Sequence, residues 1–139
     1  MTSSKRKSVT VAAVTAGAMC AAAIPVTAHA QNELHNITYI ARVDGVAPGS
    51  QATFRISDTQ VNTATLSSVP GNPFEANTVL ADPAKAGMQV AIHWPYSANV
   101  HCEIDVDDTV ATQVDQFVRP ILGSTDPMNG VLGCGAPLT

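Results

Sequence analysis

Residues 89–106, QVAIHWPYSANVHCEIDV, constrain the fold more than any other part of this chain. Apolar and polar residues alternate on both sides of a Pro-containing segment, with the period of two that is typical of strands with one face in a core. The pattern predicts a β-hairpin with a five-residue loop at 95–99, in which Trp94 pairs with Val100 and His93 with His101. The predicted inward face carries Val90, Ile92, Trp94, Val100, Cys102, Ile104 and Val106.

The predicted outward face of this hairpin is polar and carries two histidines. His93 and His101 would lie opposite each other, at a Cβ separation of ~4.5–5.5 Å, and Glu103 would follow on the same face. A His/His/carboxylate set is a conceivable site for Zn²⁺ or Cu²⁺. Two exposed histidines are the simpler interpretation, because no fourth ligand is evident. We therefore assign no metal ligand and no cofactor.

The other strand patterns are short and separated by turn residues. Alternating or β-branched segments occupy residues 36–43, 52–57, 60–66 and 109–114, and further candidate strands occupy 74–80 and 131–132. Residues 82–87 read as a turn with room for one helical turn, and Asp107-Asp108 reads as a tight turn. No long stretch has helical periodicity. We expect an all-β fold, a small antiparallel, immunoglobulin-like β-sandwich of six to seven strands.

Residues 1–30 have the features of a secretory signal peptide. A basic segment containing Lys5, Arg6 and Lys7 precedes an uncharged Ala/Val/Thr-rich run, and an Ala-x-Ala site ends at Ala30. An uncleaved membrane anchor is the main alternative, because the uncharged run approaches the ~20 residues that span a bilayer. A lipoprotein attached through Cys20 fits less well, because Met19 stands where a small residue is expected.

Removal of residues 1–30 leaves one domain, residues 31–139, that is acidic and holds two cysteines. Four Lys and Arg face eleven Asp and Glu there, a formal charge of −7, which excludes an electrostatic footprint for nucleic acid. Cys102 and Cys134 would pair in an oxidising compartment. Their loop of about thirty residues predicts roughly 3–4 kcal/mol of stabilisation, so we interpret the bond as structural.

The sequence lacks the common motifs for catalysis and for calcium binding. The chain has no Gly-x-Ser-x-Gly, no His-Glu-x-x-His and no Gly-rich phosphate loop. A Ser97, His101 and Glu103 triad would leave the serine in a loop, so we expect no enzyme. Asp105 and its acidic neighbours at 107 and 108 lack the Gly and the closing carboxylate of a calcium loop, which favours a solvated turn.

Three segments resemble the extracytoplasmic domain of the mycobacterial MmpS small membrane proteins. They are NITYIARVDG at 36–45, the Cys-x-Ile-x-Val-Asp run at 102–107 behind an apolar-aromatic strand, and a second cysteine, Cys134, near the C-terminal end. The resemblance implies a small disulfide-bonded β-sandwich that assists MmpL-type transporters in exporting lipids or siderophores. The Ala-x-Ala site stands where that family keeps a membrane anchor.

Together these features predict a secreted or cell-envelope protein that binds a partner and has no catalytic activity. The expected partner is a protein of the envelope, such as a lipid or siderophore transporter, and contact with the membrane would require that residues 1–30 are retained. The alternative is a small extracytoplasmic protein that binds a metal or another small ligand.

Overall fold

The structure is a computed structural model of the chain, and it describes residues 33–67 and 69–139. The predicted signal peptide, residues 1–30, lies outside the described residues together with Cys20. Within the described part of the chain, no helix is both long enough and apolar enough to cross a membrane.

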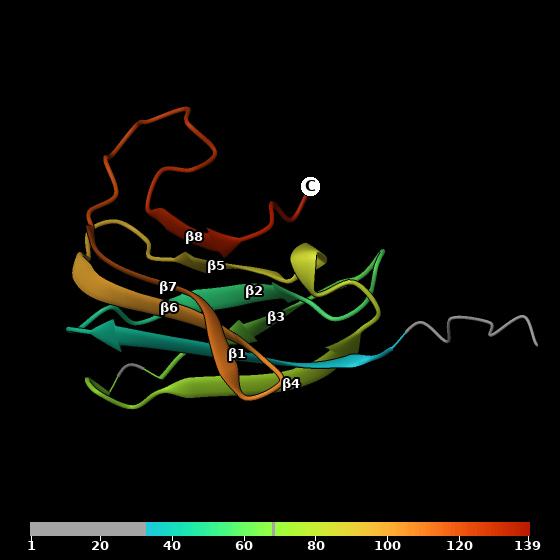
Figure 1. Cartoon of the computed structure of the whole chain (residues 1–139). Coiled ribbons are helices and arrows are strands. Elements are labelled where there is room, and N and C mark those ends of the chain that lie inside the picture. Colours follow the sequence, from blue (N-terminus) through green and yellow to red (C-terminus); the bar gives the residue numbers. More distant parts are fainter. Residues whose placement is uncertain (1–32, 68) are drawn as a thin grey trace, which may run out of the picture.

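The described residues form two four-stranded antiparallel sheets that lie face to face (Figure 1). The first sheet consists, in spatial order, of β4 (Phe74–Leu80), β1 (His35–Asp44), β6 (Ala98–Val106) and β7 (Thr109–Val118). The second consists of β3 (Val61–Thr65), β2 (Gln51–Arg55), β5 (Gly87–Ala91) and β8 (Val131–Gly135). The predicted all-β antiparallel sandwich is confirmed, but the described residues form eight strands where six to seven were expected. Both of the further candidate strands, at 74–80 and 131–132, belong to a sheet.

One turn of 3₁₀ helix, η1 (Pro83–Lys85), joins β4 to β5. The side chain of Asp82 caps it by accepting a hydrogen bond from the backbone N–H of Ala84 at 3.0 Å. Proline suits the first position of such a turn because its missing N–H would have no partner there. The helical turn expected within residues 82–87 is therefore confirmed.

β1 shows how the alternating sequence produces the sandwich. Every second side chain of this strand is buried between the sheets, namely Ile37, Tyr39, Ala41 and Val43. Tyr39 and Phe54 contact each other across the core, with ring centroids 5.4 Å apart. The hydroxyl of Tyr39 donates to the carbonyl oxygen of Arg55 at 2.7 Å, so this buried phenol keeps a hydrogen bond.

The predicted hairpin across residues 89–106 is wrong. β5 pairs with β2 and β8 in the second sheet, whereas β6 pairs with β1 and β7 in the first. The chain at 92–97 therefore crosses from one sheet to the other. Ala91 lies opposite Val131, and His101 lies opposite Arg42 and Asp115.

The inward faces of these two strands were nevertheless predicted correctly, with one exception. Val90 and Ile92 enter the core from the second sheet side, and Val100 and Cys102 enter it from the first. The exception is Trp94, which lies beyond the end of β5 and is 55% exposed. Alternation fixes the face that a strand buries, and two strands can share a core either as neighbours or from opposite sheets.

The sheet-forming hairpin in this region is β6 with β7, and its turn is formed by Asp107 and Asp108. Both residues have positive φ, 50° and 63°, as the two central residues of a type I′ turn require. Val106 and Thr109 pair directly on either side of them. The tight turn predicted at this position is confirmed.

The Cys102–Cys134 disulfide joins the two sheets. Cys102 lies on β6 of the first sheet, Cys134 lies on β8 of the second, and their Cα atoms are 6.3 Å apart. Both side chains are buried in the core. The predicted disulfide is confirmed, and its position shows that it fastens the sheets to each other rather than bracing a single hairpin.

Candidate functional site

A cleft of about 560 Å³ lies at one end of the sandwich. Two segments line it, the β5–β6 crossover and the chain that follows β7; in Figure 1 both lie at the left end. Its lining includes Trp94, Ser97, Phe117, Arg119, Ile121 and Leu122. We refer to it as the Trp94 cleft.

The crossover forms the first wall. Ile92 and Ala98 are buried and hold the two ends of this segment against the core. Between them a turn is closed by a hydrogen bond from the backbone N–H of Tyr96 to the carbonyl oxygen of His93 at 3.0 Å. With both ends anchored, the side chain of Trp94 stands outside the core and faces the cleft.

The second wall is the end of β7 and the loop at 119–130. Val118 is buried, so its neighbour Phe117 points outward, as alternation requires. The side chain of Asn129 closes the loop by accepting from the backbone N–H of Ile121 at 2.7 Å and donating to the Ile121 carbonyl oxygen at 2.9 Å. These hydrogen bonds thus hold the loop in place without using its apolar side chains.

The base of the loop is fixed to the crossover at Gly130. The backbone N–H of Ile92 donates to the carbonyl oxygen of Gly130 at 2.8 Å. A Cβ atom at position 130 would lie 2.4 Å from the Ile92 carbonyl oxygen, so only glycine fits this approach. This contact therefore fixes the position of the loop wall relative to the crossover wall.

Four large apolar side chains are exposed in the cleft. Trp94 and Phe117 are each 55% exposed, and Ile121 and Leu122 are each 69% exposed. Isolated exposed apolar residues are ordinary on a protein surface, whereas a group of them around one hollow is typical of a binding site. Ser97 and Arg119 add polar groups to the same lining. A ligand in the cleft can therefore make both polar and apolar contacts.

Arg119 is the cation of this cleft, and no described residue forms an ion pair or a hydrogen bond with its side chain. The other three cations of the described chain are engaged. Arg42 pairs with Asp44 and Lys85 with Asp58, and Arg55 donates to two backbone carbonyl oxygens. The guanidinium of Arg119 is thus available to an acidic group that enters the cleft.

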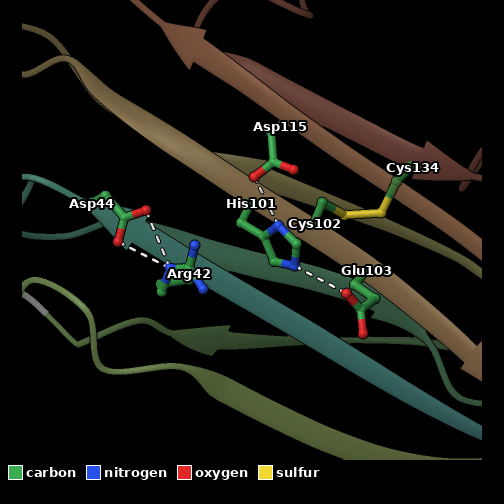
Figure 2. A network of polar contacts seen from close by, with 7 residues as sticks. All are labelled: Arg42, Asp44, His101, Cys102, Glu103, Asp115 and Cys134. Carbon is green, nitrogen blue, oxygen red and sulfur yellow. Dashed lines mark hydrogen bonds and ion pairs between the residues drawn. A yellow bond between two sulfur atoms is a disulfide. The ribbon is translucent and has the colours of Figure 1, made fainter. Parts of the chain in front are cut away.

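A second group of polar residues surrounds His101 on the outer face of the first sheet (Figure 2). The ring of His101 is only 7% exposed, because its neighbours on β1 and β7 cover it. Its Nδ1 lies 2.8 Å from Asp115 Oδ1 and its Nε2 lies 3.2 Å from Glu103 Oε2. The expectation that this histidine is exposed is wrong, because the residue is buried and both ring nitrogens contact carboxylates.

The conceivable metal set is not assembled in the structure. His101 and Glu103 are neighbours on β6, whereas His93 is exposed in the crossover and belongs to no strand. The described residues contain no group of three or more His, Cys, Asp or Glu side chains placed to hold a metal ion. The set depended on the hairpin pairing, which does not form.

Asp105 belongs to an acidic group on the same outer face. Burial raises the pKa of its carboxyl, and the charge of Glu103, with smaller effects of Asp108 and Glu75, raises it further. Its Oδ1 atom is buried and has no hydrogen-bond partner among the described residues. This arrangement destabilises the ionised carboxylate and provides no ligand set.

The sequence carries a local signal for the Trp94 cleft, but it does not show that the two segments form one site. Ile121 and Leu122 follow Pro120 in a Gly- and Pro-rich segment outside the strand patterns, and Trp94 precedes Pro95. Large apolar residues beside loop-forming residues are candidates for exposure. Only the fold shows that the two segments meet.

Comparison with protein-family models and with curated protein sequences finds no match to this chain. The functional assignment therefore depends on the geometry described above.

Proposed function

We propose that this protein is a secreted or cell-envelope binding protein without catalytic activity, and that it assists the export of an envelope lipid or siderophore. The observation that carries the proposal is the Trp94 cleft. It exposes Trp94, Phe117, Ile121 and Leu122 together on a surface built by two anchored segments. Exposed apolar side chains grouped in this way favour an interaction site.

The disulfide supports a location outside the cytoplasm. Cys102 and Cys134 are paired across the core, and such bonds persist in oxidising compartments. The basic segment and the Ala-x-Ala site of residues 1–30 support export independently, because they are typical of a secretory signal peptide. The intact mass of the protein recovered from its own host tests this: we expect a chain beginning at Gln31, two hydrogens lighter than its reduced form. A retained N-terminal segment would contradict the cleaved signal.

The surroundings of His101 support a role without catalysis. Its two ring nitrogens contact Asp115 and Glu103, and among the described residues no serine hydroxyl bonds to it. A nucleophilic triad needs one ring nitrogen directed at the nucleophile. Ser97 lies in the crossover that precedes β6 and lines the Trp94 cleft, and no hydrogen bond between described residues joins it to His101.

Deletion of the gene in its own host tests the export role. We expect the extracellular level of at least one lipid or siderophore class to fall, and complementation with the natural sequence to restore it. A Trp94→Ala, Phe117→Ala double variant should accumulate normally and fail to restore export, because both side chains are exposed and contribute little to the core.

The matched control is a Val61→Ala, Val79→Ala double variant. These valines are also exposed but lie on β3 and β4, outside the Trp94 cleft. This variant should restore export as well as the natural sequence does. An unchanged profile of exported lipids and siderophores in the deletion strain would rule out the accessory role.

A further inference from the structure

We propose that the Trp94 cleft binds a monomeric amphiphile with one acidic head group, a statement that rests on the proposed function and specifies what the cleft recognises. Arg119 binds the head group. Trp94, Phe117 and Ile121 contact the apolar chain.

The charge distribution is the first argument. Residues 31–139 carry a formal charge of −7, with eleven acidic residues against four basic ones. Three of the basic side chains are engaged with other groups of the protein, and the fourth, Arg119, lines the cleft. Among the described residues, the guanidinium that no other group of the protein engages thus lies in the hollow that also exposes apolar side chains. A planar guanidinium is well suited to bind a single carboxylate or phosphate.

The size and the lining of the cleft also favour a small amphiphile. A volume of about 560 Å³ lies within the ~300–1,000 Å³ that is usual for small-molecule sites. Ser97 provides a hydroxyl in the same lining as Arg119, while Phe117 and Ile121 provide apolar surface. A lining that combines a cation and a hydroxyl with apolar side chains suits a ligand that carries both a polar and an apolar part.

The anchoring of both walls is the third argument. The Asn129 side chain holds Ile121 through two hydrogen bonds, and the Gly130 carbonyl holds Ile92. Little ordering entropy remains to be lost on binding when the walls are already fixed. A preformed cleft of this kind favours a small ligand.

The same charge argues against an anionic membrane as the occupant. A surface with a formal charge of −7 is repelled by anionic lipid head groups over a Debye length of ~8 Å at physiological salt. A single acidic amphiphile reaches Arg119 without bringing a charged plane against the rest of the domain. The monomeric ligand therefore fits better than a bilayer.

Fluorescence of Trp94 provides a direct test, because it is the single tryptophan of the chain. Dodecanoic acid is titrated below its micelle-forming concentration, and dodecanol, with the same chain and no charge, is titrated in parallel. We expect a saturable change of emission with the acid and binding at least about 10-fold weaker with the alcohol, since hydrogen bonds to charged groups are worth more than neutral ones. Calorimetry supplies a second readout that does not depend on tryptophan.

Arg119→Gln isolates the head-group contact. Arg119 is exposed, so the variant should fold, and its thermal unfolding is recorded to confirm this. We expect its affinity for dodecanoic acid to fall about 10-fold or more while its affinity for dodecanol stays the same. Lys85→Gln is the matched control, because it removes another exposed cation outside the Trp94 cleft and should leave both affinities unchanged.

Three outcomes would overturn the inference. They are no binding of the acid by fluorescence and calorimetry, equal binding of acid and alcohol, or binding to phosphatidylglycerol vesicles with none to the monomeric acid. Each leaves the export test above unaffected, because that test measures loss of export in the host. If deletion of the gene reduces export but the protein does not bind the acid, the proposed function stands and this ligand is rejected.

Discussion

His35 Nδ1 lies 2.7 Å from Asp107 Oδ2, which joins the start of β1 to the turn between β6 and β7. The other carboxylate oxygen of Asp107 accepts the backbone N–H of Asn36 at 2.9 Å. The hydrogen bond to Asp107 is the largest cause that raises the pKa of His35 above its ordinary 6.5. The same bond, followed by the one from Asn36, lowers the pKa of Asp107 below its ordinary 3.8.

These opposite shifts predict a bounded pH window for the contribution of this pair to stability. The His35 part is complete below pH 6.5 and is lost as the pH rises through the raised folded pKa. The Asp107 part is complete above pH 3.8 and is lost as the pH falls through the lowered folded pKa. The melting temperature of His35→Gln should therefore lie furthest below that of the natural protein near pH 5. The difference in melting temperature between the two proteins should become smaller at both lower and higher pH.

Asp58→Asn is the control for this titration. It breaks an exposed carboxylate–lysine pair that contains no histidine, so its effect should be flat between pH 6 and pH 8. A His35→Gln effect that is equally flat over that range would contradict the assignment to the imidazolium.

Asp105→Asn should stabilise the protein at pH 7. The pKa of Asp105 is raised in the folded state, mainly by burial and next by Glu103, so the ionised carboxylate opposes folding at neutral pH. We expect a gain of about 0.5 kcal/mol or more in the free energy of unfolding, measured by urea denaturation. The gain should disappear toward pH 3, where the carboxyl is protonated in both states.

Asp115→Asn provides the comparison, because it removes a carboxylate that contacts His101. This side chain is largely exposed, so we expect a loss of about 1 kcal/mol or less. A loss of stability in both variants would show that Asp105 makes a favourable contact that its pKa does not reveal.

Gly130→Ala and Gly123→Ala separate backbone strain from steric contact. Their φ values are nearly equal, +74° and +77°, but a Cβ at 130 would meet the Ile92 carbonyl oxygen and Pro120, whereas one at 123 would meet nothing within 4 Å. Strain should cost each variant about 1 kcal/mol. Overpacking should cost Gly130→Ala a further ~1–3 kcal/mol and shift the emission of Trp94. Equal urea midpoints would show that the loop base is not held as described.

Replacement of both cysteines by alanine should lower the free energy of unfolding by about 3–4 kcal/mol, given the sequence separation of 32 residues. The slope of the urea transition should rise, because the unfolded chain exposes more surface without the bond. The natural protein under reducing conditions is the control and should behave like the double variant. Equal stability of the oxidised and reduced proteins would contradict a structural role for Cys102 and Cys134.

The strands and the faces that they bury could be predicted from the sequence, because both follow from local alternation. Ile37 and Tyr39 on β1, and Cys102 and Ile104 on β6, point inward as the period of two requires. The disulfide followed from the count of cysteines. The partner of each strand could not be predicted, because β5 and β6 bury the same residues whether they pair with each other or lie in opposite sheets.

The candidate site escaped prediction for the same reason. The set of His93, His101 and Glu103 required lateral pairing of β5 with β6, and the crossover separates the first of them from the other two. The Trp94 cleft depends on the meeting of two segments through Gly130 and Ile92. Such contacts between distant loops leave no periodic pattern in the sequence.

The order of strands in the first sheet has a kinetic consequence. β1 lies between β4 and β6, so it gains neither neighbour until much of the chain is available. The long loops between β1 and its two neighbours must close before either of these strand pairs forms. This requirement slows folding relative to a protein that is built of local hairpins. The β6–β7 hairpin, closed by Asp107 and Asp108, is the local exception within this sheet. We expect it to nucleate the fold, and the late arrival of β1 to set the rate.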